Sequence, residues 1–195
     1  MRLFVAVDID DRTRGGVARA IDVLRTALEA AQSTARVSWV APDRLHLTLQ
    51  FIGQVSEDTA AAIEARLGPP FELPAFEMRL GSIGTFPPGG RPRVVFLALD
   101  RGADALAVLH EEVQRRLADV PFRRESRAFS PHLTLARFKH GGTRVDVERI
   151  SRVALRPAGG CTIDHVTLYQ SRLSPRGPTY TPLRATPLGA ENTRI

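Results

Sequence analysis

Two histidines in this sequence are each followed two positions later by a threonine. They are His46, in the tetrapeptide His-Leu-Thr-Leu at residues 46–49, and His132, in the same tetrapeptide at residues 132–135. An imidazole titrates near neutral pH, so one histidine can accept a proton while a second one donates a proton. A hydroxyl beside each ring can donate a hydrogen bond to an anionic oxygen. The two motifs therefore indicate general acid–base chemistry.

Leucines alternate with the polar residues in both motifs, which is the pattern of a strand with one face in the core. In the first strand we expect four apolar side chains on the core face: Leu45, Leu47, Leu49 and Phe51. The other face is expected to carry three polar side chains: His46, Thr48 and Gln50. In the second strand, Leu133 and Leu135 are expected in the core, and His132 and Thr134 are expected to face away from it.

If two such strands meet across a pseudo-twofold axis, two imidazoles and two hydroxyls converge. That set meets the needs of phosphodiester hydrolysis without a metal. One histidine takes a proton from water, the other protonates the leaving oxygen, and the hydroxyls bind the phosphate oxygens. Competing sites have little support, because the sequence lacks an HExxH pair, a cysteine–histidine cluster, a Walker-type glycine loop and a Gly-x-Ser-x-Gly turn.

The elements around the motifs are also repeated. The apolar run LFVAVD (3–8) matches VFLALD (95–100), and helical patterns follow each run at 12–31 and 103–117. A second helix is expected at 56–67, with Ser56 as its N-cap, and a shorter counterpart at about 145–152. Extended segments follow at 76–86, 162–171 and 179–183. The repeat predicts a duplicated, bilobal α+β fold, in which two mainly antiparallel sheets face a central cleft and the helices lie outside.

The composition limits the class of protein. The 195 residues fit a single domain, 1–195, made of two pseudo-symmetric lobes. One cysteine, Cys161, excludes an internal disulfide, and no apolar run approaches the roughly 20 residues that cross a bilayer. The net charge of +6 comes almost wholly from arginine, which suits phosphate oxygens but is also typical of a GC-rich genome. We expect a cytoplasmic protein with no membrane association.

Three further histidines lack the His-x-Thr context. His110 lies in an amphipathic helix, His140 in a Lys-His-Gly-Gly turn, and His165 on a strand. Each is expected to be structural or exposed to solvent.

The sequence resembles a known family over about residues 1–185. The similarity lies in the two HLTL motifs, the opening RLFVAVDI, the strand PRVVFLALD, the segment SPHLTLARF and the closing LYQSRLSPRGPTYTPL. These segments look like the RNA 2′,3′-cyclic phosphodiesterases. That group, also called 2′-5′ RNA ligases, belongs to the two-histidine phosphoesterase superfamily.

The resemblance implies hydrolysis of a terminal 2′,3′-cyclic phosphate to a 2′-phosphomonoester, without cofactor or metal. It assigns His46 as proton donor and His132 as proton acceptor, with Thr48 and Thr134 as phosphate-binding residues. Arg137 matches an arginine that reaches the phosphate, although strict alternation would place it on the core face with Leu135. A bend or bulge after Leu135, a reach around the strand edge, or a structural role for Arg137 remain open.

The expected partner is RNA with a 2′,3′-cyclic phosphate end, with tRNA fragments as one candidate, and the chain is expected to be a monomer. Two alternatives remain at this point. One is a 2′-5′ RNA ligase that runs the same chemistry in reverse, and the other is a non-catalytic RNA-binding module.

Overall fold

The structure is a computed structural model, and it describes residues 1–30, 36–88, 92–125, 127–138, 158–175 and 177–189. In chain order its elements are β1 (Arg2–Asp8), α1 (Asp11–Ala30), β2 (Val37–Trp39), the 3₁₀ helix η1 (Pro42–Arg44), β3 (His46–Gln54), α2 (Glu57–Leu67), β4 (Phe76–Phe86), β5 (Val94–Arg101), α3 (Ala103–Arg116), β6 (Leu133–Phe138), β7 (Gly160–Ile163), β8 (His165–Ser174) and β9 (Gly177–Pro187).

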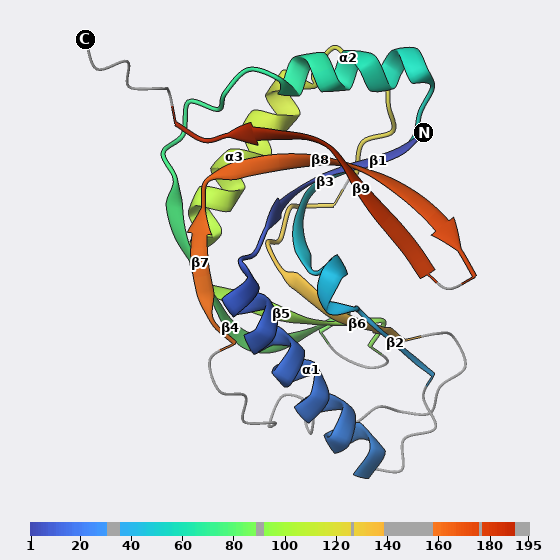
Figure 1. The fold of residues 1–195 in the computed structure, drawn as a ribbon, viewed down its shortest axis with the longest axis vertical. Coiled ribbons are helices and arrows are strands. Elements are labelled where there is room, and N and C mark those ends of the chain that lie inside the picture. Colours follow the sequence, from blue (N-terminus) through green and yellow to red (C-terminus); the bar gives the residue numbers. More distant parts are fainter. Residues whose placement is uncertain (31–35, 89–91, 126, 139–157, 176, 190–195) are drawn as a thin grey trace.

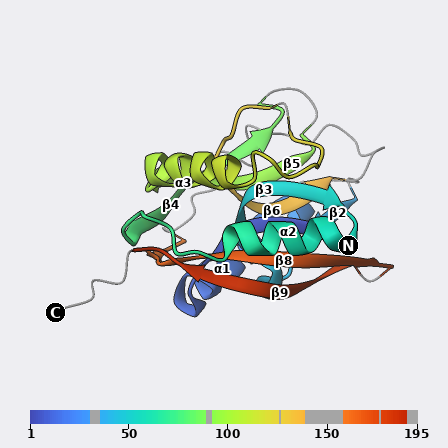
Figure 2. The same ribbon diagram turned by 90° about the horizontal axis from the view of Figure 1, so that it is seen from above.

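The described strands form two sheets. Sheet A has the order β3-β1-β8-β9, sheet B has the order β2-β6-β5-β4-β7, and each ladder between these strands is antiparallel. Figure 1 shows α1 and α2 at opposite ends of the molecule, outside the sheets, and Figure 2 shows α3 on the side opposite the β8–β9 hairpin. The predicted α+β class with two antiparallel sheets is therefore confirmed.

The three helices expected from apolar periodicity at 12–31, 56–67 and 103–117 are α1, α2 and α3, with bounds that differ by one residue or less. Ser56 is the N-cap of α2, and its hydroxyl accepts a hydrogen bond from the Thr59 amide at 3.1 Å. The helix expected at 145–152 lies outside the described residues. None of the helices among the described residues is long and apolar enough to cross a membrane.

Strands from both halves of the sequence repeat are present in each sheet. The first half contributes β4 to sheet B, where it pairs with β5, and the second half contributes β8 and β9 to sheet A, where β8 pairs with β1. β4 and β5 are consecutive strands, which favours direct antiparallel pairing. The two lobes therefore share backbone hydrogen bonds, and neither sheet is built from one half alone.

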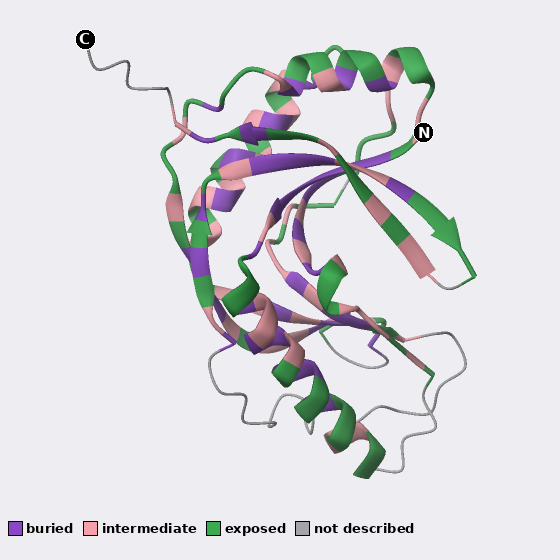
Figure 3. Cartoon of the chain, viewed as in Figure 1, coloured by how far each residue is buried: buried purple, intermediate pink, exposed green. Residues whose placement is uncertain are grey.

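The core lies between the sheets and the helices (Figure 3). Five consecutive residues of β1, from Leu3 to Val7, are buried, as expected of a strand that is covered on both faces. The helix α1 contributes Val17, Ile21 and Leu24 to the core, whereas Val23 is 47% exposed.

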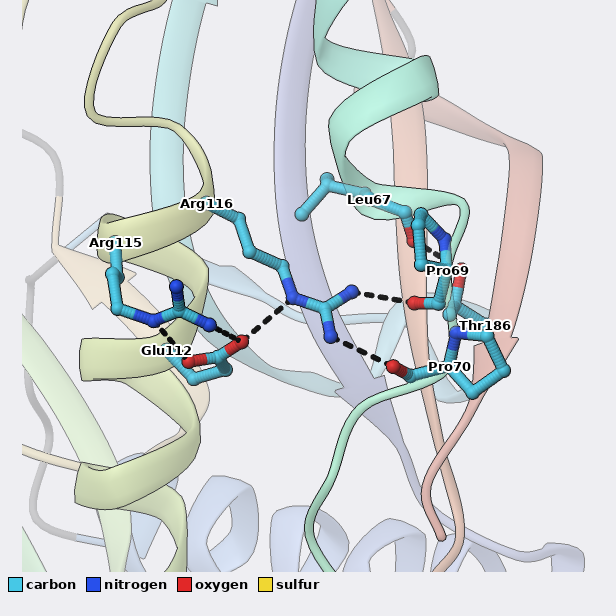
Figure 4. Close-up of polar contacts among 7 residues, drawn as sticks. All are labelled: Leu67, Pro69, Pro70, Glu112, Arg115, Arg116 and Thr186. Carbon is cyan, nitrogen blue, oxygen red and sulfur yellow. Dashed lines mark hydrogen bonds and ion pairs between the residues drawn. The ribbon is translucent and has the colours of Figure 1, made fainter. Parts of the chain in front are cut away.

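A cluster of polar contacts joins α3 to the segment between α2 and β4 (Figure 4). The Arg116 guanidinium donates to the carbonyl oxygens of Pro69 and Pro70, and its Nε donates to Glu112 at 2.8 Å. Its carbon Cζ also lies 3.9 Å from the ring centroid of the buried Phe71. These contacts hold the end of α3 against the chain that leads into sheet B.

The first prediction compares two neighbouring arginines that bind the same carboxylate. The side chain of Arg116 is 11% exposed and that of Arg115 is 73% exposed. We expect Arg116→Ala to lower the free energy of unfolding by about 2–3 kcal/mol, because two carbonyls and one carboxylate lose a charged donor. The matched variant Arg115→Ala is expected to cost much less, because water screens an exposed ion pair. Urea denaturation measures both, and equal losses would contradict this role of Arg116.

Candidate active site

The first motif strand, β3, alternates as expected only as far as Leu49. Its ladder with β1 pairs Ala6 with Thr48 and Val5 with Gln50, so Leu49 is an extra residue that forms a β-bulge. Beyond the bulge the faces exchange. Gln50 is 3% exposed and Phe51 is 43% exposed, so the expectations that Phe51 lies in the core and that Gln50 faces away from it are both wrong. The bulge instead places Phe51 on the same face as His46 and Thr48.

The second motif strand, β6, has its bulge at the equivalent position. Its ladder with β5 pairs Phe96 with Thr134 and Val95 with Ala136, which leaves Leu135 as the extra residue. Ala136 is consequently buried, and Arg137 returns to the face that carries Thr134. Three explanations were possible for Arg137: a bend or bulge after Leu135, a reach around the strand edge, or a structural role. The structure shows the bulge.

The two bulge carbonyls have different partners. The Leu135 carbonyl accepts a hydrogen bond from the Val40 amide at 2.9 Å, and the Leu49 carbonyl accepts one from Nδ1 of His110 at 2.7 Å. The His110 ring also stacks on Phe129, with 4.2 Å between centroids, in the segment that leads to the second motif. His110 therefore links the first motif strand to the segment before the second motif, which is the structural role expected of it.

Both motif histidines are oriented by the same backbone contact. Nδ1 of His46 lies 2.8 Å from the Arg44 carbonyl, and Nδ1 of His132 lies 2.7 Å from the Ser130 carbonyl. A carbonyl only accepts, so Nδ1 carries the hydrogen in each ring and Nε2 is left as the reactive nitrogen. Nε2 of His46 lies 3.1 Å from the Thr48 hydroxyl.

Aromatic rings surround each imidazole. His46 packs against Phe4 and the edge of Tyr180, with centroids 4.8 and 5.3 Å away. His132 packs against Phe86 and Phe96, with centroids 5.1 and 5.2 Å away. Burial lowers the pKa of both histidines below the ordinary value, although the backbone hydrogen bond of each ring raises it.

The structure brings the two motifs together around one arginine. β3 and β6 are in contact although they belong to different sheets. The positive charge of Arg137 contributes to the lowered pKa of both His46 and His132, after the larger effect of burial. Thr48 and Thr134 lie on the same faces as their histidines. The five residues singled out in the sequence therefore lie on the faces of β3 and β6 that point away from the core leucines.

β1 and β8 add further groups beside His46 that the motif pattern does not predict. Asp8 is the cross-strand partner of His46 in the β1–β3 ladder. Its carboxylate accepts hydrogen bonds from the Thr167 hydroxyl at 2.8 Å and the Tyr169 hydroxyl at 2.7 Å. Nε2 of His165 lies 3.5 Å from the same carboxylate. The only signal in the sequence was the acidic residue that ends the apolar run 3–8.

His165 thus belongs to the surroundings of the site, while remaining about two-fifths exposed. The hydrogen bond with Asp8, followed by that with Asp164, raises the pKa of His165 to about 9 against the opposing effect of burial. His140 lies outside the described residues. Within the described part of the chain, no three His, Cys, Asp or Glu side chains gather closely enough to hold a metal ion.

Comparison with known proteins now gives the family. The model of the 2′-5′ RNA ligase superfamily matches residues 16–174. The chain belongs to this superfamily. It is 34% identical to the RNA 2′,3′-cyclic phosphodiesterase of Archaeoglobus fulgidus over 184 residues. This aligned region covers 94% of this chain and 98% of the relative.

Solved structures agree with this membership. The protein TT0787 of Thermus thermophilus superposes with a TM-score of 0.78 at 27% identity, covering 98% of this chain and 100% of that one. LigT of Escherichia coli in its apo form gives a TM-score of 0.73 at 27% identity, covering 97% and 98%. The family and the fold expected from the HLTL motifs are both confirmed.

The second prediction concerns the order in which the histidines titrate. In the free protein we expect His165 to lose its proton at about pH 9 and the two motif histidines to titrate below 6.5, their ordinary value. NMR titration of the imidazole resonances measures all three. A His165 midpoint at or below those of His46 and His132 would contradict the contacts described here.

The raised pKa of His165 also predicts a dependence of stability on pH. Its protonated form gains the Asp8 and Asp164 contacts on folding, so the stabilisation is complete below pH 6.5 and is lost as pH rises through about 9. Thermal unfolding should therefore show that His165→Gln lowers Tm most at about pH 6 and least at about pH 10, on either side of that window.

Proposed function

We propose that this protein hydrolyses the 2′,3′-cyclic phosphate at the 3′ end of an RNA to a 2′-phosphomonoester, without a metal. The observation that carries the proposal is the matched orientation of two partly buried imidazoles. Each ring is fixed through Nδ1 by a backbone carbonyl, and the charge of Arg137 acts on both. One anionic group at Arg137 can therefore be approached by two reactive Nε2 atoms.

In this mechanism His132 is the general base and His46 is the general acid. His132 removes a proton from water, which attacks the phosphorus, while His46 protonates the departing O3′. The guanidinium of Arg137 and the hydroxyls of Thr48 and Thr134 bind the non-bridging oxygens, where negative charge develops. The family resemblance gives the direction of proton transfer.

Binding of the substrate also favours the required protonation. Burial and Arg137 both lower the pKa of the two histidines in the free protein. A cyclic phosphate is an anion. Its negative charge offsets that of the Arg137 guanidinium and raises the pKa of the neighbouring histidines, which favours the imidazolium form. The pair then carries one proton at neutral pH, as acid–base catalysis in a single step requires.

An RNA end as substrate is supported by the names of the relatives and by the basic, arginine-rich chain. The family's ligase chemistry would use the same groups in reverse, with a 5′-hydroxyl in place of water. Water at bulk concentration favours hydrolysis, so we rank the phosphodiesterase first. A cytoplasmic location and a monomeric state stay predictions.

The third prediction tests the histidine pair. A short RNA ending in a 2′,3′-cyclic phosphate should be hydrolysed in the presence of excess EDTA. His46→Ala and His132→Ala should each lose about 10²–10⁴-fold in rate, because acid and base act in one step. The control is Arg115→Ala, an exposed substitution on α3 that should keep the full rate. Circular dichroism verifies folding, and a rate that chelation abolishes and a divalent ion restores would overturn the mechanism.

The fourth prediction concerns which bond breaks. A donor on one fixed strand protonates only the ribose oxygen that points toward it, so a single isomer should form. With His46 beside O3′ the phosphate remains on O2′. Phosphorus NMR of the product distinguishes the isomers directly. A 3′-phosphate, or an even mixture, would show that His46 and His132 have been given the wrong roles.

A further inference from the structure

The duplication is broken at the position that faces each catalytic histidine. In the repeat, Ala6 of β1 corresponds to Ala98 of β5. Ala6 pairs with Thr48, however, whereas the residue that pairs with Thr134 is Phe96, so the second ladder is displaced by two residues. One consequence is that Asp8 faces His46, while extension of the β5–β6 ladder by one residue places Ala98 opposite His132.

The carboxylate that corresponds to Asp8 in the repeat is directed elsewhere. It belongs to Asp100, whose Oδ1 occupies the space where a Cβ on Gly81 of β4 would lie. Asp100 is exposed, and its side chain covers β4 rather than the second motif. In this fold, therefore, the ladders give a cross-strand carboxylate to His46 and not to His132.

Asp8 is held in place and kept ionised. Burial raises the pKa of its carboxyl, but the hydrogen bonds from His165, Tyr169 and Thr167 outweigh burial and leave the pKa below its ordinary value. His165 is itself paired with Asp164 at 2.5 Å, so the group formed by Asp8, His165 and Asp164 keeps one net negative charge at neutral pH.

We propose that Asp8 is a positioning residue which, when the histidine pair holds a single proton, places that proton on His46 and so makes His46 the donor. The inference rests on the proposed function and deepens it. Cross-strand partners in a ladder have Cβ atoms about 5 Å apart, close enough for the carboxylate to stabilise an imidazolium.

The other groups that face the two rings do not replace this contribution. Arg137 from β6 opposes protonation of both histidines, and Tyr180 from β9 presents a neutral ring edge to His46. Glu125 acts on His132 in the same direction as Asp8 acts on His46, but its side chain is exposed and its charge is screened by water. Burial is the largest effect on both rings and opposes protonation of each. Among the charges that face them, the hydrogen-bonded carboxylate of Asp8 distinguishes His46 from His132.

The test uses two substitutions with opposite expected signs. Asp8→Asn removes the negative charge and keeps the shape, so the NMR titration midpoint of His46 should fall by roughly one pH unit, and that of His132 by much less. His165→Gln removes the positive charge beside Asp8 and keeps a donor, so the His46 midpoint should rise. Asp100→Asn, the counterpart in the repeat, should move neither histidine. A role of Asp8 in folding alone would not give shifts of opposite sign.

The pH–rate profile with the cyclic phosphate substrate links these shifts to catalysis. A donor must be protonated, so in Asp8→Asn the basic limb should move to lower pH by roughly one unit while the acidic limb stays. Movement of the acidic limb instead would make His46 the base and overturn the proposal, as would unchanged NMR midpoints. The titrations need no substrate. A wild-type protein without activity would therefore contradict the proposed function. The NMR titration midpoints of His46 and His132 would still decide whether Asp8 acts on His46.

Discussion

The site depends on an extra residue three positions after each motif histidine. A regular strand would direct the side chain five positions after each motif histidine into the core. The bulges at Leu49 and Leu135 reverse that direction, so Phe51 and Arg137 lie on the site faces. For Arg137 the reversal matters most, because it turns a guanidinium whose charge acts on both imidazoles away from the core.

The exchange of strands between halves gives these bulged strands a rigid support. β4 lies in the sheet of the second motif, and β8 and β9 lie in the sheet of the first. Movement of one lobe relative to the other would therefore strain backbone ladders as well as side-chain packing. Catalysis with two groups on different sheets needs such support, because their separation must match one phosphate to within a fraction of an ångström.

In the proposed mechanism two similar motifs perform opposite proton transfers, and their surroundings differ. Both rings share the Nδ1–carbonyl contact, the aromatic packing and Arg137. The difference lies in the neighbouring strand, which presents a carboxylate to His46 and an alanine toward His132. A displacement of two residues in one ladder is sufficient, because a two-residue shift preserves the faces and changes only which residues are opposite each other.

The sequence by itself determined the repeated elements, the three helices and the chemistry, since these depend on local periodicity and on side-chain types. It also placed His46, Thr48, His132 and Thr134 on the correct faces, because each lies before the bulge of its strand. Alternation failed at Gln50, Phe51 and Arg137, because a bulge is a mismatch between two strands and leaves no mark on either one alone. The pairing of Asp8 with His46, and the exchange of β4 with β8 and β9, were likewise decided only by the tertiary structure, because register and strand order depend on residues far apart in the chain.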